Sequence, residues 1–196
     1  MPSAHAVEKQ RLRRAIRAWR DQLAAHDRNR WSAAICDHLR QFAPFSRARS
    51  PALFWGMPTE VDLAPLADAR CVWPVVVGRG CALALRRGLP RFPGPYGILE
   101  PSADDPAVSH GSIDLVVFPG MAFDAKGHRL GHGAGYYDRT FANTTALRVG
   151  VCFAAQLVPA VPVDEWDLPM HVLITEEGLQ RVTEPPPGSP AARLLA

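Results

Sequence analysis

The N-terminal part of the chain carries apolar residues at the spacing of an α-helix. Within residues 8–26, four of them fall on one face of a predicted helix: Leu12, Ile16, Trp19 and Leu23. A second helix is predicted next, with Asp27 as its N-cap and an apolar stripe of its own: Trp31, Ile35, Leu39 and Phe42. We expect this helix to end at Pro44, because proline cannot continue a helix.

Beyond residue 50 the apolar residues come in short runs instead. Strands are predicted at 51–55, 71–77, 81–85, 113–119, 146–153 and 171–175. The run 113–119, IDLVVFP, gives the strongest signal because it is continuous and rich in β-branched residues. Helices are predicted around 61–69 and at 136–143. This alternation is typical of an α/β fold with a mostly parallel sheet covered by helices.

Proline and glycine mark two further segments. Residues 86–106, RRGLPRFPGPYGILEPSADDP, predict no regular element, and a stretch of this length in a compact domain often serves as a lid or binding loop. The last residues, 184–196, are also proline-rich, and we expect them to be disordered. The length of 196 residues suits one domain, so we expect a single domain over 1–183 followed by the tail.

The composition fits a protein that fills a core in water. Hydrophobic residues make up 47% of the chain, and the mean hydropathy is −0.06. No apolar run approaches the ~20 residues that a membrane helix needs. The N-terminus lacks the apolar stretch of a secretory signal, so we expect a cytoplasmic protein. The scattered cysteines predict reduced thiols rather than a disulfide frame or a zinc site: Cys36, Cys71, Cys81 and Cys152.

The basic residues are almost all arginines. The net charge is +3, and Lys9 and Lys126 are the only lysines among 22 basic residues. Codon usage could explain this excess. Arginine also presents a planar fork of donors that suits phosphate and carboxylate, which favours an anionic ligand.

A glycine-rich segment follows the strand predicted at 113–119. Its sequence, RLGHGAGYYDR (129–139), matches neither the G-x-x-x-x-G-K-[ST] phosphate loop nor the dinucleotide fingerprint G-x-G-x-x-G. Alternating glycines nevertheless allow several backbone N–H groups to point into one concavity, and a helix starting near Tyr136 would add its positive end. Arg129 and Arg139 flank the segment. We therefore predict a phosphate-binding loop; a plain turn with core tyrosines is the alternative.

A longer stretch around this loop resembles a known family. PGMAFDAKGHRLGHGAGYYDR (119–139) is similar to the signature of the 5-formyltetrahydrofolate cyclo-ligases, also called methenyltetrahydrofolate synthetases. Three shorter motifs of that family have counterparts in the same order: KQRLR (9–13), MPTEVDL (57–63) and PYGILEP (95–101). The resemblance runs from about Lys9 to Thr175. It implies a three-layer fold similar to the NagB/RpiA/CoA-transferase type.

The resemblance implies an ATP- and Mg²⁺-dependent reaction in which 5-formyltetrahydrofolate becomes 5,10-methenyltetrahydrofolate, with release of ADP and phosphate. In this family the γ-phosphoryl group is transferred to the formyl oxygen, which otherwise is a poor leaving group. The 10-nitrogen then attacks the iminium phosphate and phosphate leaves. Such chemistry asks the protein mainly for positioning and charge stabilisation. The expected partners are folate and ATP, bound by a monomer without nucleic acid or membrane.

Matching the family motifs position by position implies roles for individual residues. The ATP-binding positions are Lys9, Arg13, Arg129, Gly131, His132, Gly133, Ala134, Gly135, Tyr136 and Tyr137. The substrate-binding positions are Trp55, Glu60, His132, Gly133, Gly135 and Tyr136, with Glu60 receiving the N–H donors of the pterin. The catalytic positions are Arg129, Tyr136 and Tyr137. The magnesium-associated positions are Asp138 and Asp167.

The chain also departs from the family pattern. His132 stands where tyrosine or arginine is common, Ala134 where glycine or lysine is usual, and His171 where a second aspartate often follows Asp167. The segment 86–93 is shorter than usual. These departures leave room for a paralogue that binds folate or nucleotide without turnover. An RNA-associated protein using the arginine-rich first helix is a third reading, but acidic residues are mixed among those arginines and stacking aromatics are absent there.

Overall fold

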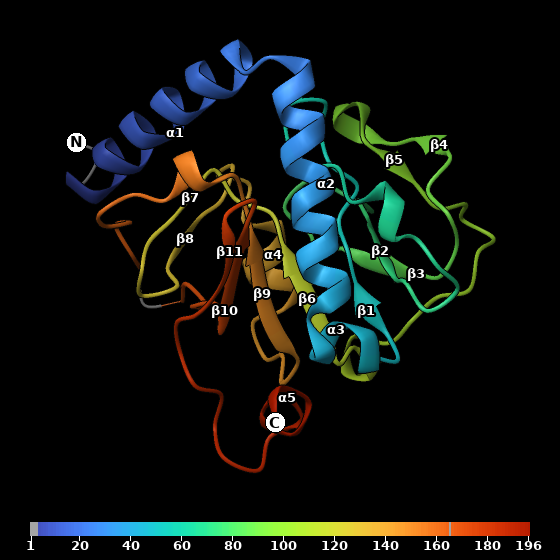
Figure 1. The fold of residues 1–196 in the computed structure, drawn as a ribbon. Coiled ribbons are helices and arrows are strands. Elements are labelled where there is room, and N and C mark those ends of the chain that lie inside the picture. Colours follow the sequence, from blue (N-terminus) through green and yellow to red (C-terminus); the bar gives the residue numbers. More distant parts are fainter. Residues whose placement is uncertain (1–3, 165) are drawn as a thin grey trace.

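A five-stranded sheet forms the centre of the protein, as a computed structural model of residues 4–164 and 166–196 shows (Figure 1). Within these residues the strands of this sheet, in spatial order, are β1 (Pro51–Ala52), β6 (Leu115–Phe118), β9 (Leu147–Val151), β10 (Val172–Thr175) and β11 (Gly178–Arg181). The first three pairings are parallel and the β10–β11 pairing is antiparallel. The predicted α/β fold with a mostly parallel sheet is confirmed. No strand was predicted after 171–175, and this is wrong because β11 follows it.

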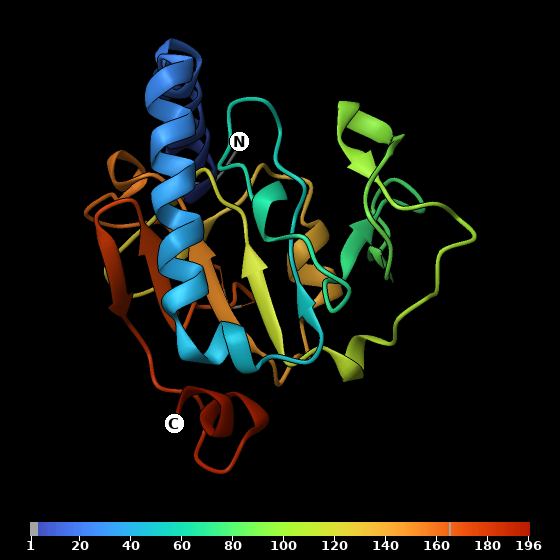
Figure 2. The ribbon, with the colours of Figure 1, turned by 45° about the vertical axis from the view of Figure 1, so that its right-hand side comes forward.

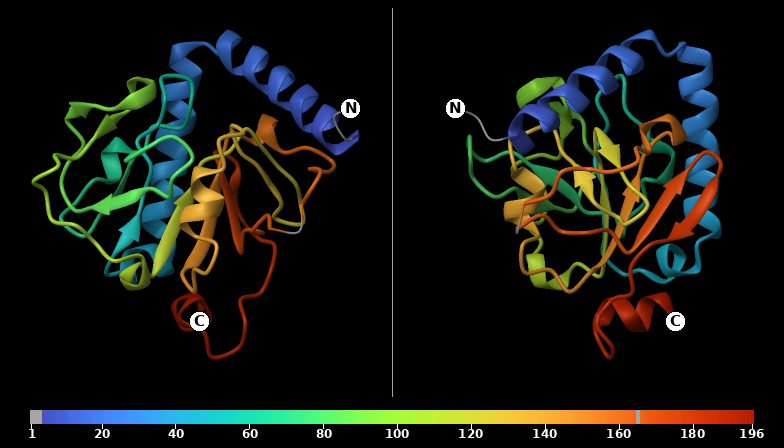
Figure 3. Two further views of the ribbon diagram at one scale, coloured as in Figure 1. Left: turned by 180° about the vertical axis from the view of Figure 1, so that it is seen from behind. Right: turned by 90° about the vertical axis from the view of Figure 1, so that its left-hand side faces the viewer.

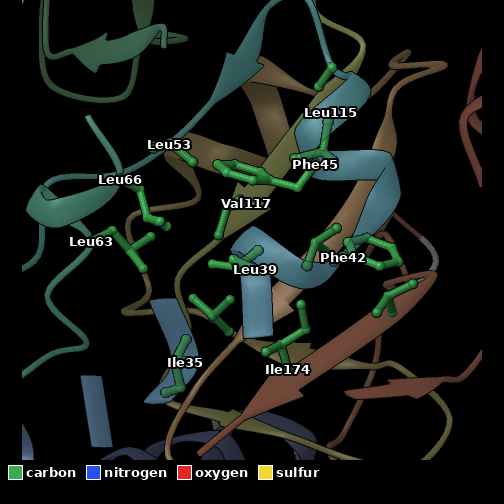
Figure 4. Packing of buried hydrophobic residues seen from close by; sticks show 14 of the residues in the cluster. Ile35, Leu39, Phe42, Phe45, Leu53, Leu63, Leu66, Leu115, Val117 and Ile174 are labelled. Atoms are coloured by element: carbon green, nitrogen blue, oxygen red, sulfur yellow. The ribbon is translucent and has the colours of Figure 1, made fainter. Parts of the chain in front are cut away.

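Helices cover both faces of this sheet, so three layers result (Figures 1 and 3). Along β6 the side chains alternate between two cores: Leu115 and Val117 lie in one, while Val116 and Phe118 lie in the other. The first core packs under three helices: α2 (Ala25–Gln41), α3 (Ala43–Arg47) and α5 (Pro190–Leu195). Figure 4 shows its packing around Leu39. The second core lies on the side of α4 (Tyr136–Thr140).

The two N-terminal helices form where the apolar spacing predicts them. Helix α1 (Ala4–Gln22) lies across β7 (Ala122–Phe123) and buries Leu12 and Ile16 there. Trp19 of α1 and Trp31 of α2 stack with their ring centroids 6.4 Å apart. The N-cap prediction is wrong, because α2 begins at Ala25 with Ala24 as its N-cap. Asp27 lies in the first turn and pairs with Arg30 instead.

Other boundaries differ because of proline. Helix α2 ends at Gln41, and Pro44 lies in the first turn of α3, where a missing N–H costs nothing. The helix predicted around 61–69 is only a 3₁₀ turn at Ala64–Leu66, which contains Pro65. The runs 71–77 and 81–85 give β2 (Trp73–Val75) and β3 (Ala84–Arg86), which pair with each other outside the central sheet.

The segment 86–106 contains regular structure after all. It holds β4 (Phe92–Pro93), a 3₁₀ turn at Pro95–Gly97 and β5 (Leu99–Glu100), and the two strands form an antiparallel hairpin. Together with β2 and β3, this hairpin forms a lobe beside the β1 edge of the sheet (Figure 2). Another hairpin, β7 with β8 (Arg129–Leu130), leads into the glycine-rich segment.

The C-terminal tail is ordered, contrary to expectation. Ser189 caps α5 by accepting a hydrogen bond from the amide of Ala192, and Ala191 and Leu195 are buried in the core under α2. Burial of these two apolar side chains supplies free energy that a proline-rich composition does not reveal. Across the described residues, no helix is long and apolar enough to cross a membrane. The four cysteines, all within the described part, are free thiols as predicted.

Candidate active site

A cavity of about 390 Å³ lies at the carboxyl ends of β1 and β6, the neighbouring parallel strands. Trp55 follows β1 and Pro119 follows β6, and both line it. Its aromatic walls are Phe54, Trp55, Trp73, Tyr96, Tyr136 and Tyr137. Its ionisable residues are Arg17, Glu60, Glu100, Arg129, His132 and Asp138. A mostly aromatic cavity of this size with a few polar groups is typical of small-molecule sites, and in α/β sheets such sites lie at the carboxyl ends of strands.

The glycine-rich segment forms one rim of this cavity, between β8 and α4. Gly133 and Gly135 have φ values of 105° and 67°, which side chains disfavour. Among the described residues, none accepts a hydrogen bond from the backbone amides of 131–135. Such a run of unpaired amides is able to bind an anion. Helix α4 has five residues rather than the eight expected at 136–143, so the anion argument depends on the loop amides and not on a helix end.

Glu60 is held at the centre of a buried polar cluster. Its Oε1 accepts from His132 Nε2 at 2.8 Å and from Arg20 Nη1 at 3.4 Å, and its Oε2 accepts from the amide of Met57 at 3.0 Å. Burial alone would raise the pKa of Glu60. The hydrogen bond and charge of His132, the charge of Arg20 and the Met57 amide outweigh burial and lower that pKa. Glu60 is therefore an ionised acceptor in the wall of the cavity.

Arg129 is the most enclosed cation in the cavity wall. Its Nη2 donates to Asp138 Oδ1, and its Nη1 donates to the carbonyl of Pro119 at 3.2 Å. The guanidinium lies over the rings of Phe118 and Tyr137, with its central carbon 5.4 Å and 5.9 Å from the ring centroids. These contacts fix the orientation of Arg129, as a residue that stabilises developing negative charge requires.

The two adjacent tyrosines play different structural parts. Tyr136 reaches across the mouth of the cavity, where its hydroxyl lies 3.2 Å from that of Tyr96, and this hydrogen bond raises the pKa of Tyr136. Tyr137 packs against Phe118 with ring centroids 5.6 Å apart. Burial raises the pKa of Tyr137 strongly, and the negative charge of Glu60 adds to the effect. Both tyrosines are therefore neutral phenols at ordinary pH.

Lys9 and Arg13 of α1 lie on the outer side of the glycine-rich segment. Arg13 Nε donates to the carbonyl of Gly131 at 2.8 Å, and burial lowers the pKa of Arg13. Lys9 Nζ forms ion pairs with Asp164 at 2.7 Å and with Asp167 at 2.9 Å. Burial alone would lower the pKa of Lys9, but these two carboxylates raise it. Lys9 is therefore charged, and its charge is already balanced.

The structure gathers most of the predicted site residues around one cavity. The predicted residues that line it are Trp55, Glu60, Arg129, Gly131, His132, Ala134, Gly135, Tyr136, Tyr137 and Asp138. Gly133 lies against Arg13, outside the lining. The two aspartates predicted to bind magnesium are engaged by different cations, Asp138 by Arg129 and Asp167 by Lys9. The described residues contain no group of three or more metal-ligating His, Cys, Asp or Glu side chains.

Sequence reasoning missed several residues of this site. Arg20 binds Glu60, and Arg17 lines the cavity. Together with Arg13 they lie at spacings of four and three, which places them on one helix face. That spacing is a usable signal that this helix face carries functional residues. Tyr96 and Glu100 also line the cavity. Both belong to the PYGILEP motif, which was noticed only as part of the resemblance.

Fold and site together define an α/β protein with an aromatic small-molecule cavity beside a glycine-rich loop. Residues 5–176 match the 5-formyltetrahydrofolate cyclo-ligase family, and the chain belongs to that family. The 5-formyltetrahydrofolate cyclo-ligase of Escherichia coli K12 is 30% identical over 174 residues, covering 82% of this chain and 96% of that protein. The Haemophilus influenzae cyclo-ligase is 28% identical, covering 85% and 97%. The predicted family and the predicted ligase class are confirmed.

Solved structures agree with this assignment. The 5,10-methenyltetrahydrofolate synthetase of Aquifex aeolicus has a TM-score of 0.80 and 33% identity, over 90% of this chain and 93% of that chain. The 5,10-methenyltetrahydrofolate synthetase of Mycoplasma pneumoniae has a TM-score of 0.69 at 20% identity, which shows the shared fold. The three-layer arrangement described above is therefore that of a known enzyme fold.

Proposed function

We propose that this protein converts 5-formyltetrahydrofolate to 5,10-methenyltetrahydrofolate with consumption of ATP. One observation carries the proposal beyond family membership. The buried carboxylate of Glu60 lines the same cavity as Gly131, His132, Ala134 and Gly135 of the loop with unpaired amides, and His132 Nε2 lies 2.8 Å from Glu60 Oε1. An acceptor for a ring with N–H donors and a cradle for phosphate thus lie side by side.

The aromatic part of the cavity suits the folate. Trp55 and Trp73 form a wall with their ring centroids 5.6 Å apart, and Tyr96 and Tyr136 form another at 6.4 Å. Flat rings bury well between such walls because aromatic side chains offer large apolar faces. Glu60 would accept the N–H donors of the pterin, and charge-assisted hydrogen bonds of this kind are the stronger ones.

The loop and its arginines suit the nucleotide. The amides of 131–135 would bind phosphate oxygens, and Arg13 steadies the loop through the carbonyl of Gly131. Arg129 lies in the cavity wall, where it would stabilise negative charge on the transferred phosphoryl group. Lys9 could meet a phosphate only by sharing its charge with Asp164 and Asp167.

Magnesium would join the site through Asp138. Asp138 lines the cavity next to the loop, and Mg²⁺ typically takes one or two carboxylates together with phosphates and waters. When bound, the ion neutralises charge on the phosphates during transfer. Asp167 does not line the cavity and would take part through its ion pair with Lys9 or after rearrangement. Carboxylates are suitable ligands for Mg²⁺, although Asp138 is paired with Arg129 and Asp167 with Lys9.

The reaction places distinct demands on these residues. The γ-phosphoryl group goes to the formyl oxygen, the 10-nitrogen then bonds to the formyl carbon, and the carbon–oxygen bond to phosphate breaks. Arg129 orients and balances the phosphoryl charge. Tyr136 and Tyr137, as neutral phenols, shape the cavity and can donate hydrogen bonds to the oxygens. Exclusion of water by the aromatic walls protects the reactive intermediate from hydrolysis.

One assay tests this function directly. We expect the absorbance of the methenyl product to rise when the protein, 5-formyltetrahydrofolate and Mg-ATP are mixed, and to stay flat when any one of them is omitted. 10-Formyltetrahydrofolate in place of the 5-formyl isomer should give no ATP hydrolysis. Release of ADP without folate would contradict the proposal and indicate a simple ATPase.

A non-catalytic paralogue is the second candidate, and two observations favour it. His132 already occupies one oxygen of Glu60, and Lys9 is already neutralised by two carboxylates. Calorimetry separates the two candidates: a paralogue binds folate or nucleotide but forms no methenyl product. We further propose a cytoplasmic monomer that needs no nucleic-acid or membrane partner. The free thiols are compatible with a reducing compartment, and light scattering in solution tests the monomer.

A further inference from the structure

Glu100 is a buried carboxylate in the wall of the cavity that has almost no partners. Glu100 is only 9% exposed, and it lines the cavity. Oε1 accepts one hydrogen bond, from the amide of Val76 at 3.0 Å. Among the described residues, no side chain or amide donates to Oε2, and no lysine, arginine or histidine forms an ion pair with Glu100.

Other buried carboxylates of this protein are satisfied quite differently. Asp124 accepts from three backbone amides and from the ring of His128 at 2.9 Å. Glu60 has His132, Arg20 and one amide. The second oxygen of Glu100, Oε2, is not among the enclosed unpaired atoms of the described residues, so it is open to the cavity, where a positively charged ligand can pair with it.

The β4–β5 hairpin sets the position of Glu100. Glu100 pairs with Phe92 in this hairpin. Gly94 lies so near that a Cβ atom there would be 2.4 Å from the Glu100 side-chain carboxyl carbon. Gly94 therefore leaves room for the Glu100 carboxylate where it now lies, and a larger residue there would displace it. The hairpin therefore holds the carboxylate toward the cavity.

We infer that Glu100 is a ligand-binding residue that balances positive charge on the folate. This inference rests on the proposed function. The reacting nitrogens of 5-formyltetrahydrofolate are neutral. The iminium phosphate carries a positive charge at the 5-nitrogen, and the methenyl product shares a positive charge between the 5- and 10-nitrogens. When the ring closes, a carbon–nitrogen bond forms, the carbon–oxygen bond to phosphate breaks with its electron pair going to phosphate, and the proton of the 10-nitrogen leaves to the phosphate.

A carboxylate without a cationic partner favours the charged species over the neutral substrate. Such an interaction is stronger in the intermediate than in the ground state, and only interactions of that kind accelerate the chemical step. Glu60 is less suited to this task because Arg20 and His132 already face it. Glu60 would thus recognise the N–H donors of the pterin, and Glu100 would balance the positive charge that develops on the folate.

The test compares Glu100→Gln with Glu176→Gln. Glu176 also accepts one backbone amide, that of Ala154 at 2.8 Å, but it does not line the cavity. For Glu100→Gln we expect kcat to fall at least tenfold and the affinity for 5,10-methenyltetrahydrofolate to fall at least tenfold. The affinity for 5-formyltetrahydrofolate without ATP should change by less than about threefold. Glu100→Asp, which keeps the charge, should recover part of the loss, and Glu176→Gln should match the wild type.

The outcomes separate this inference from the proposed function. If Glu100→Gln binds the cation and turns over like the wild type, or loses cation and neutral folate equally, the charge-balancing role is wrong. If the wild type shows no turnover, the proposed function fails, and preference for the cationic over the neutral folate, measured by calorimetry, still decides the role of Glu100. A protein that binds neither folate overturns both.

Discussion

His132 Nε2 lies 2.8 Å from Glu60 Oε1, across 72 residues of sequence. This hydrogen bond ties the glycine-rich segment, which would cradle phosphate, to the MPTE segment, which would recognise the folate. Arg20 of α1 reaches the same carboxylate oxygen at 3.4 Å. The helix, the loop and the cavity wall therefore meet at one buried negative charge, and a change at Glu60 has consequences for both binding and stability.

Glu60→Gln should weaken folate binding much more than ATP binding. The amide keeps the shape of the side chain and can still accept from His132, so the loop should stay in place. It loses the charge-assisted hydrogen bonds to the pterin, worth roughly 1.5–3 kcal/mol. It also leaves the buried Arg20 without its counter-ion, which should lower the free energy of unfolding by about 2–4 kcal/mol.

Calorimetry with each ligand and urea unfolding check this prediction. Glu60→Ala, which cannot accept from His132, should disturb ATP binding as well and serves as the comparison. Equal losses of folate and ATP affinity in Glu60→Gln would instead indicate a purely structural role for the carboxylate.

The side chain of Tyr96 should contribute to folate binding, whereas its backbone conformation should lower the free energy of unfolding. It is the one non-glycine residue with positive φ in the described chain, at 67°, and its side chain is 63% exposed. Tyr96→Gly should relieve about 1 kcal/mol of backbone strain and so leave the free energy of unfolding unchanged or higher. The same variant loses the contact with Tyr136 over the cavity, so we expect at least tenfold weaker folate binding.

Tyr96→Phe isolates the hydroxyl pair, because it keeps the ring and removes only the 3.2 Å contact with Tyr136. We expect a small loss, within about threefold, because exposed hydrogen bonds contribute little. Folate affinity unaffected in Tyr96→Gly would show that the β4–β5 hairpin is not part of the binding site.

Asp167 is one of the two aspartates predicted to bind magnesium, and its neighbour Asp164 offers a matched control. Asp164 and Asp167 both pair with Lys9, at 2.7 Å and 2.9 Å, but only Asp167 is predicted to bind magnesium. Asp167→Asn should raise the Mg²⁺ concentration needed for half-maximal activity, whereas Asp164→Asn should not. Either variant leaves Lys9 with one carboxylate, so their stabilities should be similar. Magnesium titrations that overlay for both variants and the wild type would exclude Asp167.

Asp138→Asn should have the larger effect on turnover, because Asp138 lines the cavity and orients Arg129. We expect kcat to fall at least a hundredfold and the magnesium requirement to rise. Some stability should be lost too, since Arg129 is buried and loses its counter-ion. If kcat falls while the magnesium titration stays that of the wild type, Asp138 acts only by orienting Arg129.

The sequence predicts the parts of this fold that depend on local pattern. The continuous apolar run around Val117 gives β6, and the helical spacing of Leu12 and Ile16 gives α1. It fails where contacts distant along the chain decide. Leu195 in the tail becomes ordered by docking into the core under α2, and Val75 pairs in a second sheet because its partner lies in β3. Neither outcome leaves a signal in a local window.

In the candidate site, too, local sequence patterns predict some features, and contacts between distant parts of the chain decide the others. The glycine spacing and the family motif predict the loop and Glu60, and residues of both line the cavity. The partnership of Glu60 with Arg20 depends on how α1 lies across β7, which no motif encodes. The left-handed backbone of Tyr96 is likewise invisible, because a tyrosine gives no hint of positive φ. The single hydrogen bond of the Glu100 carboxylate can be recognised only once the surrounding residues are placed.

His171 should make the stability of the protein depend on pH. It is buried, its Nδ1 accepts from the amide of Arg148 at 3.1 Å, and its Nε2 is enclosed without a partner among the described residues. Protonation would force Nδ1 to give up this hydrogen bond. Burial first, and then the charge of Arg148, lower the pKa of His171 from 6.5 to about 4.

Because the folded pKa of His171 lies below the unfolded one, the unfolded chain binds the proton first as pH falls. The contribution is complete above the unfolded pKa of 6.5 and is lost as pH falls toward the folded pKa of about 4. We expect a loss of about 2 kcal/mol between about pH 7.5 and about pH 5. This loss of free energy of unfolding can be measured by urea unfolding of the wild type and of His171→Gln. The amide oxygen of the glutamine can still accept from the amide of Arg148. Other titrating groups affect both proteins equally, so the stability difference between them should shrink on acidification. A difference that stays constant across this range would show that His171 keeps an ordinary pKa in the folded protein.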